Sequence, residues 1–262
     1  MYNTHMVGVI NRTPIKFFFE IIFTKPSKFW QIITGLKILL LPDSEVYDLI
    51  KRGYSFARWG DGETAVCRGK FAWYQEHSAE LEKKLVKLLK HTPTEVILGF
   101  PWAVYTGPND KRWNMRIFKI IFSTRVFVIK NLNNKKLMNR QYSTLDFWWR
   151  KSNDLSALLK RLLDGKYCIL ISSNREYLKF CPENTFFISA PEINAFASYE
   201  DIRIEIDAYI KRFERFPVIL SAIGPASKAL VLDYSGICQV LDIGHGFSFA
   251  LNGPNAWAWT NT

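Results

Sequence analysis

The sequence predicts an α/β fold, Rossmann-like in the loose sense, with a mostly parallel sheet and flanking helices on both faces. Short apolar runs rich in β-branched and aromatic residues recur along the chain, and each ends at a Gly, Pro, Ser or Asn. Segments with helical spacing lie between these runs, which is typical of βαβ units. The 262 residues can bury one substantial core, so we expect one main domain.

Six segments are expected to be buried strands. They are residues 55–59, 96–100, 167–172, 185–189, 218–223 and 239–243. Parallel strands place their carboxyl ends at one edge of the sheet, where such folds bind ligands. The residues that directly follow each apolar run are therefore the candidates for chemistry.

Three segments are expected to be helices between the strands. The clearest is 78–91, in which leucines recur at helical spacing and Glu80 precedes Lys84 by four positions. Residues 154–163 and 199–213 show a similar pattern. The alternation begins near residue 45, so the main domain is expected to span residues 45–262.

Residues 1–44 are expected to form an amphipathic helical extension in front of this domain. The apolar stretch 17–41 is interrupted by charged residues, so we expect neither a membrane span nor a signal peptide. Lysines flank its aromatic and aliphatic residues. This pattern fits helices that lie in a lipid headgroup layer, and it fits equally well a pair of helices packed on the domain's own core.

The chain is basic, with 35 Lys and Arg against 24 Asp and Glu and a net charge of +11. The stretch 111–145 contains nine of the basic residues and no acidic one. Such a balance favours an anionic partner: nucleic acid, a nucleotide diphosphate or an anionic membrane surface. The stretch could equally be a solvated face. The four cysteines form no Cys-x-x-Cys pair, which is typical of reduced core cysteines in a cytoplasmic protein.

Two carboxylates follow the first predicted strand, in the segment Arg58-Trp59-Gly60-Asp61-Gly62-Glu63. The glycines let the backbone bend, while the acidic side chains project from it. Mg²⁺ or Mn²⁺ prefers one or two protein carboxylates together with phosphate oxygens. The preceding arginine can bind phosphate. An Asp-Gly-Glu alone is usually only a turn, so this segment is a candidate metal site and not a proof of one.

The segment from Ser221 to Lys228 runs from a predicted strand into a predicted helix, with Gly224 at the turn. Backbone N–H groups at such a turn can bind an anion, and Ser227 and Lys228 lie close enough to join them. The spacing is neither that of a P-loop nor that of a dinucleotide-binding turn, which disfavours ATP hydrolysis and NAD chemistry. An ordinary strand-to-helix turn remains an alternative.

The last predicted strand ends in Asp242-Ile243-Gly244-His245. The carboxylate and the imidazole could serve as a metal ligand, a base or a diphosphate contact. A lone histidine is more often structural. The sequence contains no His-x-x-His and no Gly-x-Ser-x-Gly, which argues against a zinc hydrolase and a serine hydrolase.

These segments, together with Pro191-Glu192-Ile193-Asn194-Ala195-Phe196, resemble the GT-D type glycosyltransferases over roughly residues 45–250. The resemblance implies a GT-D fold and a glycosyltransferase of the hexosyltransferase class. It also implies a nucleotide-sugar donor such as a UDP-sugar and a divalent ion, commonly Mn²⁺, bound by an Asp-x-Glu motif. Members of this family act in bacterial surface glycan or glycoprotein glycosylation. The implied acceptor is therefore a glycan, including a lipid-linked one.

The resemblance assigns roles to particular residues. Glu63 is expected to be a direct metal ligand, and Asp61 a second ligand or a donor-ribose contact. Asp242 or His245 is expected near the diphosphate, and Glu192 is a candidate base by its place at a strand end. The remaining expected donor-binding residues are Arg58, Gly60, Gly62, Gly224, Ser227 and Lys228.

Other classes of function stay open. A nucleic-acid-binding module would explain the basic stretch 111–145, but paired carboxylates at a strand end would repel a phosphate backbone, so no nucleic acid partner is expected. A metal-dependent phosphohydrolase would use the same carboxylates. A catalytically inert scaffold at a membrane would not need the carboxylates Asp61 and Glu63. The expected location is cytoplasmic, with peripheral contact to the inner membrane face as a further hypothesis.

Overall fold

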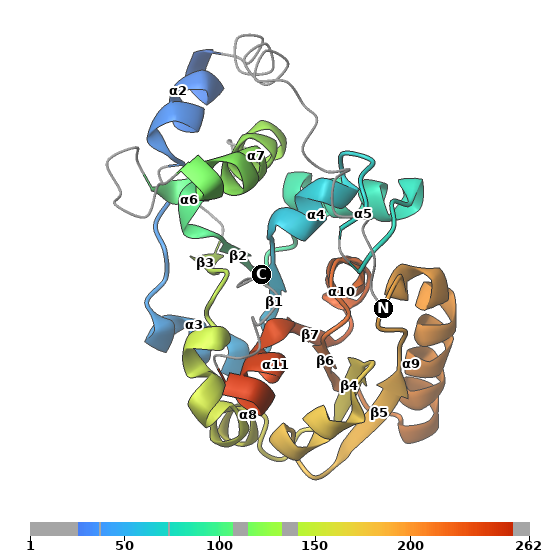
Figure 1. Ribbon diagram of the computed structural model, residues 1–262. Coiled ribbons are helices and arrows are strands. Elements are labelled where there is room, and N and C mark those ends of the chain that lie inside the picture. Colours follow the sequence, from blue (N-terminus) through green and yellow to red (C-terminus); the bar gives the residue numbers. More distant parts are fainter. Residues whose placement is uncertain (1–25, 37, 73, 107–114, 133–140, 254–262) are drawn as a thin grey trace.

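The structure is a computed structural model that describes residues 26–36, 38–72, 74–106, 115–132 and 141–253. A seven-stranded sheet with only parallel pairs crosses the molecule (Figure 1). The order of its strands is β3-β2-β1-β7-β6-β4-β5. The strands are β1 (Ser55–Arg58), β2 (Val96–Phe100), β3 (Gln141–Thr144), β4 (Cys168–Ser172), β5 (Thr185–Ser189), β6 (Val218–Ser221) and β7 (Gln239–Asp242). The expected α/β class and parallel sheet are confirmed.

All six expected strands are present, with ends one or two residues shorter in four of them. Strand β3 was not predicted. Its residues, Gln-Tyr-Ser-Thr, are mostly polar and lack an apolar run. It pairs only with β2, at the edge of the sheet, where a polar strand is tolerated because one side has no neighbouring strand.

Helices cover the sheet, and the three expected ones are confirmed as α5, α8 and α9. In α5 the hydroxyl of Ser78 accepts a hydrogen bond from the backbone N–H of Leu81, which caps the helix. The helices are α2 (Pro26–Thr34), α3 (Asp43–Lys51), α4 (Asp61–Val66), α5 (Ala79–Lys90), α6 (Trp102–Tyr105), α7 (Met115–Asn131), α8 (Leu155–Leu162), α9 (Tyr199–Phe213), α10 (Ala226–Tyr234) and α11 (His245–Asn252). Short 3-10 turns are η2 (Trp149–Asp154), η3 (Arg175–Phe180) and η4 (Ala195–Ser198).

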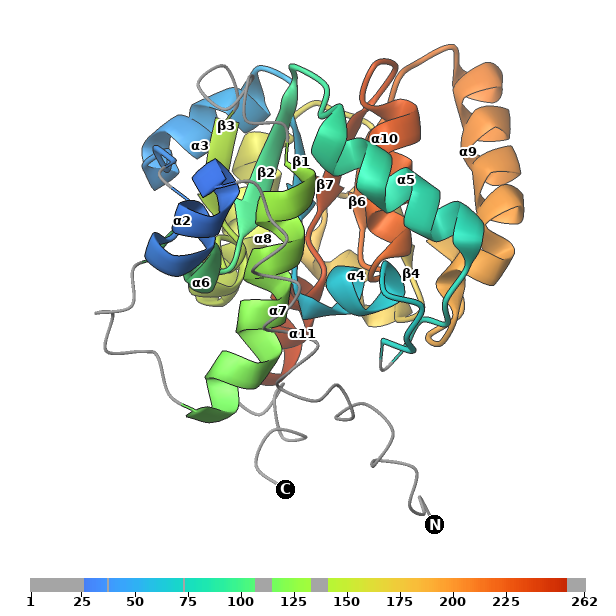
Figure 2. The same cartoon turned by 90° about the horizontal axis from the view of Figure 1, so that it is seen from above.

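Each face of the sheet has its own hydrophobic core, because successive side chains of a strand point to opposite faces. Phe56 and Ile97 enter the core that α3, α8 and α11 cover. Ala57 and Leu98 enter the core that α5, α7, α9 and α10 cover. Figure 2 shows α5 and α10 together on one side of the sheet, with α3 and α8 behind it. The burial of both faces explains why strands such as β2 and β4 are apolar along nearly their whole length.

The described part of the N-terminal extension packs on the main domain. Helix α2 lies against α7, and Ile32 and Leu36 are buried in the same core as α5 and α7. Trp30 and Leu39 are 63% and 85% exposed. The extension therefore has both a core-packed side and an exposed apolar side. Residues 1–25 lie outside the described residues.

Part of the basic stretch 111–145 belongs to the core. Arg125 on α7 is 1% exposed and donates hydrogen bonds to the carbonyl oxygens of Thr106 (3.0 Å) and Ile33 (2.8 Å). Burial lowers its pKa to about 10. This arginine joins α7 to the chain after α6 and to α2, so it does not present its charge to an external anion. Residues 111–114 and 133–140 lie outside the described residues.

No helix in the part of the chain that the structure describes has the length and apolar character needed to cross a bilayer.

We predict that Gly99→Ala destabilises the protein by about 1–3 kcal/mol, because a side chain there overpacks the core. A Cβ atom at Gly99 would lie 3.1 Å from two ring carbons of Phe56 and 3.1 Å from the carbonyl oxygen of Thr144. Urea unfolding measures the change. The matched control is Gly236→Ala, where a Cβ meets no atom within 4 Å. Equal stabilities of the two variants would contradict the prediction.

Candidate active site

The candidate site lies where β1 and β7 end side by side. Strand order changes direction here, since the chain builds β2 and β3 on one side of β1 and places β7, β6, β4 and β5 on the other. In open parallel sheets, ligands bind beyond the carboxyl ends of the strands at such a point. Arg58 is the last residue of β1 and Asp242 is the last residue of β7. Two residues far apart in sequence thus meet at the site.

Trp59 fixes the backbone at the end of β1. Its indole ring is fully buried and stacks on Phe127, with ring centroids 6.2 Å apart and planes 11° from parallel. Its Nε1–H donates to the hydroxyl of Thr64 at 3.2 Å. The tryptophan therefore points into the core, and the residues on either side of it are left for the site.

Glu63 is buried and holds two other segments of the site. Its Oε2 accepts a hydrogen bond from the backbone N–H of Gly60 at 2.7 Å, which caps the first turn of α4. Its Oε1 lies 2.6 Å from the Nζ of Lys228. Both carboxylate oxygens thus have protein partners.

Lys228 is the centre of this buried network. Its side chain is 1% exposed, and its Nζ lies 2.6 Å from Glu63 Oε1 and 2.8 Å from Asp242 Oδ2. It also donates to the carbonyl oxygen of Gly224 at 3.2 Å. An ammonium group has three N–H donors, and three protein oxygens lie around this one. Lys228 thus connects α4, the turn before α10 and the end of β7.

Asp242 is fully buried and also accepts a hydrogen bond from the backbone of β1. Its Oδ2 accepts a hydrogen bond from the backbone N–H of Arg58 at 3.0 Å. Its Oδ1 lies 3.6 Å from Arg58 Nε. Two acidic and two basic side chains therefore alternate in one buried cluster, listed along their contacts as Arg58, Asp242, Lys228 and Glu63.

The guanidinium group of Arg58 has an unfilled donor. The residue is 6% exposed, and its Nη1 makes no hydrogen bond with any described residue. Gly244 leaves room for the group, since a Cβ there would lie 2.1 Å from Nη2. The ring of Trp149 faces it at 5.4 Å. A buried donor without an acceptor is costly, which favours an anionic ligand at this point.

His245 is the first residue of α11 and stands between two aromatic rings. Its ring centroid lies 6.3 Å from that of Tyr74 and 6.1 Å from that of Trp149. Burial lowers the pKa of His245 to about 4, with the positive charges of Arg58 and Lys228 as further causes. The imidazole is therefore neutral at neutral pH and can act as a hydrogen-bond partner or as a base.

Asp61 differs from Glu63 in its surroundings. Its side chain is exposed, and its Oδ1 accepts a hydrogen bond from the N–H of Gly62 at 3.1 Å. Although the residue is exposed at the surface, the surrounding protein removes part of the water from its carboxyl group, and this desolvation, followed by the charge of Glu63, raises its pKa. This carboxylate is thus the accessible member of the Asp-Gly-Glu segment.

The donor set fits a divalent ion that is completed by oxygens of a ligand, with Asp61 as the accessible carboxylate. Among the described residues, no group of three His, Cys, Asp or Glu side chains could hold a metal by itself. An ion that takes one protein carboxylate and the oxygens of a diphosphate needs no such group. Each carboxylate oxygen of Glu63 has one protein partner, Lys228 or the N–H of Gly60, and keeps a second lone pair. The expected ligand role of Glu63 stays a prediction.

In the turn before α10, a serine stabilises the backbone and a glycine lets an aromatic ring approach closely. The Ser227 hydroxyl lies 2.8 Å from that of Ser221 and accepts from the N–H of Ile223, so it stabilises the turn itself. Gly224 has a φ of +60°, and a Cβ there would lie 2.3 Å from the ring of Tyr74. The turn thus accommodates a neighbouring aromatic side chain.

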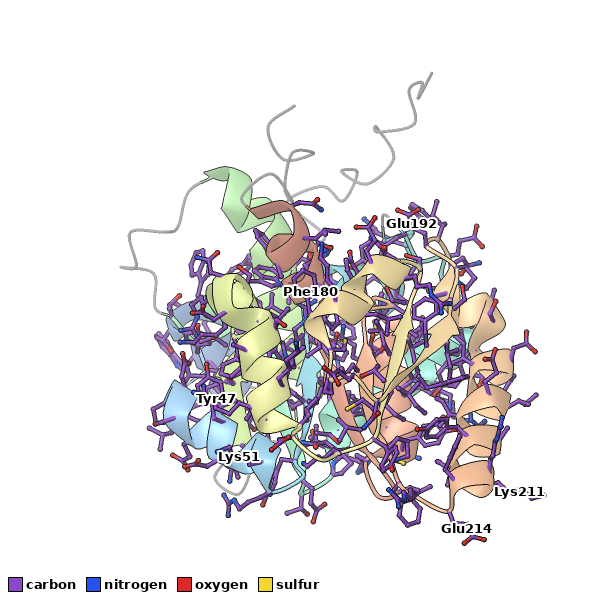
Figure 3. All side chains as sticks on the ribbon, turned by 90° about the horizontal axis from the view of Figure 1, so that it is seen from below. Tyr47, Lys51, Phe180, Glu192, Lys211 and Glu214 are labelled. Atoms are coloured by element: carbon purple, nitrogen blue, oxygen red, sulfur yellow. The ribbon has the colours of Figure 1, made fainter. Side chains whose placement is uncertain are left out.

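The structure does not bring Glu192 into the buried cluster. It is exposed and follows β5, the edge strand, which is three positions away from β7. Figure 3 shows it at the outer rim of the molecule. Sequence reasoning missed Tyr74 and Trp149, which do reach the site, because each lies within a run of aromatic residues that resembles core sequence.

We predict that Lys228→Met destabilises the protein by about 3–5 kcal/mol, because it leaves Glu63 and Asp242 buried without their cation. Adding Glu63→Gln to this variant should recover part of the loss, since one of the two uncompensated charges is then removed. Urea unfolding of both variants measures the effect. A loss below about 1 kcal/mol in Lys228→Met would show that the cluster is not a stabilising network.

Comparisons with known proteins identify the family and the fold of this chain. Residues 56–248 match the family described as "Glycosyltransferase GT-D fold". Among curated proteins, no sequence matches this chain.

Solved structures share the fold. One is described as a new glycosyltransferase, domain of unknown function 1792, from Streptococcus sanguinis. It is 23% identical, with 86% of this chain and 85% of that chain covered and a TM-score of 0.63. Another, described as this domain with a distinct glycosyltransferase fold, is 23% identical, with 93% and 85% covered and a TM-score of 0.64. The family match includes the Asp-Gly-Glu segment and His245, and it spans most of the sequence, so the chain belongs to the GT-D fold family of glycosyltransferases.

Proposed function

We propose that the protein is a metal-dependent glycosyltransferase that moves a sugar from a nucleotide-sugar, a UDP-sugar, to a glycan acceptor. The proposed setting is the biosynthesis of bacterial surface polysaccharide or glycoprotein. The observation that carries the proposal is the unfilled, buried donor of Arg58, three residues before the accessible carboxylate of Asp61. Together they offer a cation for a diphosphate and a ligand for a metal ion, at the edge of the sheet where such folds bind nucleotides.

The charge balance of the site supports the need for a metal. The four charges of the buried cluster cancel, so Asp61 leaves the site with one negative charge, and His245 is neutral. A diphosphate adds further negative charge. Mn²⁺ or Mg²⁺ held by Asp61 would neutralise the diphosphate and act as a Lewis acid on it.

The chain's own residues then have separate tasks. Arg58 binds the diphosphate through its unfilled N–H donors. Lys228 holds Glu63 and Asp242 in place, and Glu63 in turn positions the turn that carries Asp61. His245, as a neutral imidazole, donates a hydrogen bond to the diphosphate or accepts the proton of the acceptor hydroxyl. The rim position of Glu192 suits a contact with the acceptor better than proton transfer within the cluster.

We predict that the wild type binds and slowly hydrolyses one class among UDP-, GDP-, TDP- and CMP-sugars, with Mn²⁺ or Mg²⁺ and not with EDTA. Asp61→Asn should weaken metal-dependent binding at least about 10-fold, with little change in melting temperature, because the side chain is exposed. Glu63→Gln should lower both binding and the melting temperature, because it also loses the ion pair with Lys228.

Calorimetry and product analysis distinguish the alternatives. Binding that is unchanged by EDTA would remove the metal from the proposal. Release of free phosphate with no released or transferred sugar would indicate a phosphohydrolase. Failure to bind any of the four donor classes would contradict the glycosyltransferase proposal for this site.

We also propose that the protein works in the cytoplasm and contacts the inner membrane face through α2, which would bring it to a lipid-linked acceptor. Support comes from three exposed apolar side chains on or beside this helix: Trp30 (63%), Ile33 (38%) and Leu39 (85%). A tryptophan at the surface of a basic protein is typical of an interfacial helix.

The predicted result is that the protein co-sediments with vesicles of anionic lipids, and that Trp30→Ser with Ile33→Ser weakens this binding several-fold. The matched control is Ile237→Ser, a change of an apolar side chain that is 54% exposed after α10. If the double variant and the control bind alike, α2 is not the contact surface.

A further inference from the structure

The loop after α4 is fastened to the segment that follows β5. Gln75 in this loop is 1% exposed. Its Nε2 donates to the side-chain oxygen of Asn194 at 2.6 Å, and its Oε1 accepts from the backbone N–H of Phe196 at 3.1 Å. Buried amide side chains that are fully hydrogen-bonded hold their segments rigidly. The two segments thus form one unit, although they are about 120 positions apart in sequence.

Asn194 completes this connection and fixes the backbone of Tyr74. It adopts the left-handed conformation, with φ of 59°. Its backbone N–H donates to the carbonyl oxygen of Tyr74 at 2.6 Å, and its Nδ2 donates to the carboxylate of Glu76 at 3.1 Å. Asparagine tolerates this conformation better than most residues do. Asn194 thus fixes the backbone of Tyr74 directly and also holds the two residues that follow it, Gln75 and Glu76.

The side chain of Tyr74 lies over three segments of the site at once. Its ring covers Gly224, where a Cβ would lie 2.3 Å from its Cε2. Its hydroxyl oxygen lies near Gly62, 3.4 Å from where a Cβ would be. Its ring forms a T-shaped pair with that of His245. The phenol therefore forms a wall between α4, the turn before α10 and the start of α11.

The hydroxyl of Tyr74 can act as a hydrogen-bond donor to a ligand. Burial and then the negative charge of Glu63 raise its pKa well above the usual value, so it stays protonated. No described residue forms a hydrogen bond with this hydroxyl. The proposed function assigns Arg58 and His245 to the diphosphate. The positive charge of Arg58 acts to lower the pKa of Tyr74, and the ring of His245 packs against the ring of Tyr74.

We propose that Tyr74 is a donor-binding residue of this glycosyltransferase: its ring closes the wall of the site over Gly224, and its hydroxyl donates a hydrogen bond to the diphosphate of the nucleotide-sugar. This inference rests on the proposed function. Tyr74 belongs to a loop that none of the sequence motifs contains. In this proposal the role of Asn194 is to hold that loop in place.

The test compares Tyr74→Phe with Tyr234→Phe, which makes the same chemical change elsewhere. Tyr234, on α10, donates a hydrogen bond to Asp207, on α9, at 2.8 Å. Both residues lie outside the site. Each protein is titrated by calorimetry with UDP, GDP, TDP and CMP in the presence of Mn²⁺. Tyr74→Phe should bind the preferred nucleotide about 10-fold more weakly, the loss expected for one hydrogen bond to a charged group. Its melting temperature should stay within about 2 °C of the wild type.

The control should show the opposite pattern, with a lower melting temperature and unchanged affinity. Unchanged affinity in Tyr74→Phe, when the wild type binds a nucleotide, would overturn the role of Tyr74 and leave the proposed function standing. A wild type that binds none of the nucleotides would overturn both. Weaker binding that comes with an equally large loss of stability in Tyr74→Phe would also overturn it, because the hydroxyl would then be structural.

Discussion

The ion pairs of Lys228 hold the whole site together. One buried ammonium group binds Glu63 on α4 and Asp242 at the end of β7, and its own helix, α10, begins after β6. Burying an ion is costly unless it is paired and hydrogen-bonded, so neither the lysine nor the two carboxylates can be stable there alone. The ends of three strands are thereby tied to one point. Glu63, Asp242 and, through Asp242, the end of β1 at Arg58 are held by this arrangement.

The same constraint divides the work between the two carboxylates of the Asp-Gly-Glu segment. Glu63 is committed to Gly60 and Lys228, whereas Asp61 stays exposed at the start of α4. Two acids two residues apart thus have opposite surroundings, which is a common way for one site to give two carboxylates different roles. In the proposed enzyme the buried acid shapes the site, and the accessible acid meets the metal and the donor.

The basic composition of the chain has more than one cause. Arg125 joins α2 and α6 to α7 from within the core, and Lys228 and Arg58 are balanced by buried acids. Arg125 and Lys228 therefore tell nothing about an external anion. The hypothesis that the stretch 111–145 binds nucleic acid therefore loses Arg125 as a possible phosphate contact. The unfilled donor of Arg58, by contrast, favours a small anionic ligand.

The sequence by itself determined the class of fold, because runs such as 168–172 are apolar on both faces and are separated by helices with a single apolar stripe. It also marked Asp61, Glu63, Gly224, Asp242 and His245, since strand ends in a parallel sheet collect at one edge. It could not show β3, whose stability comes from pairing with β2, nor Tyr74, whose role depends on hydrogen bonds to a segment about 120 residues away. Only the tertiary structure decided that Glu63 is buried against Lys228 while Asp61 is accessible, and that Glu192 is exposed outside the buried cluster. Those differences come from long-range contacts, and residue type and spacing do not encode which oxygen meets which cation.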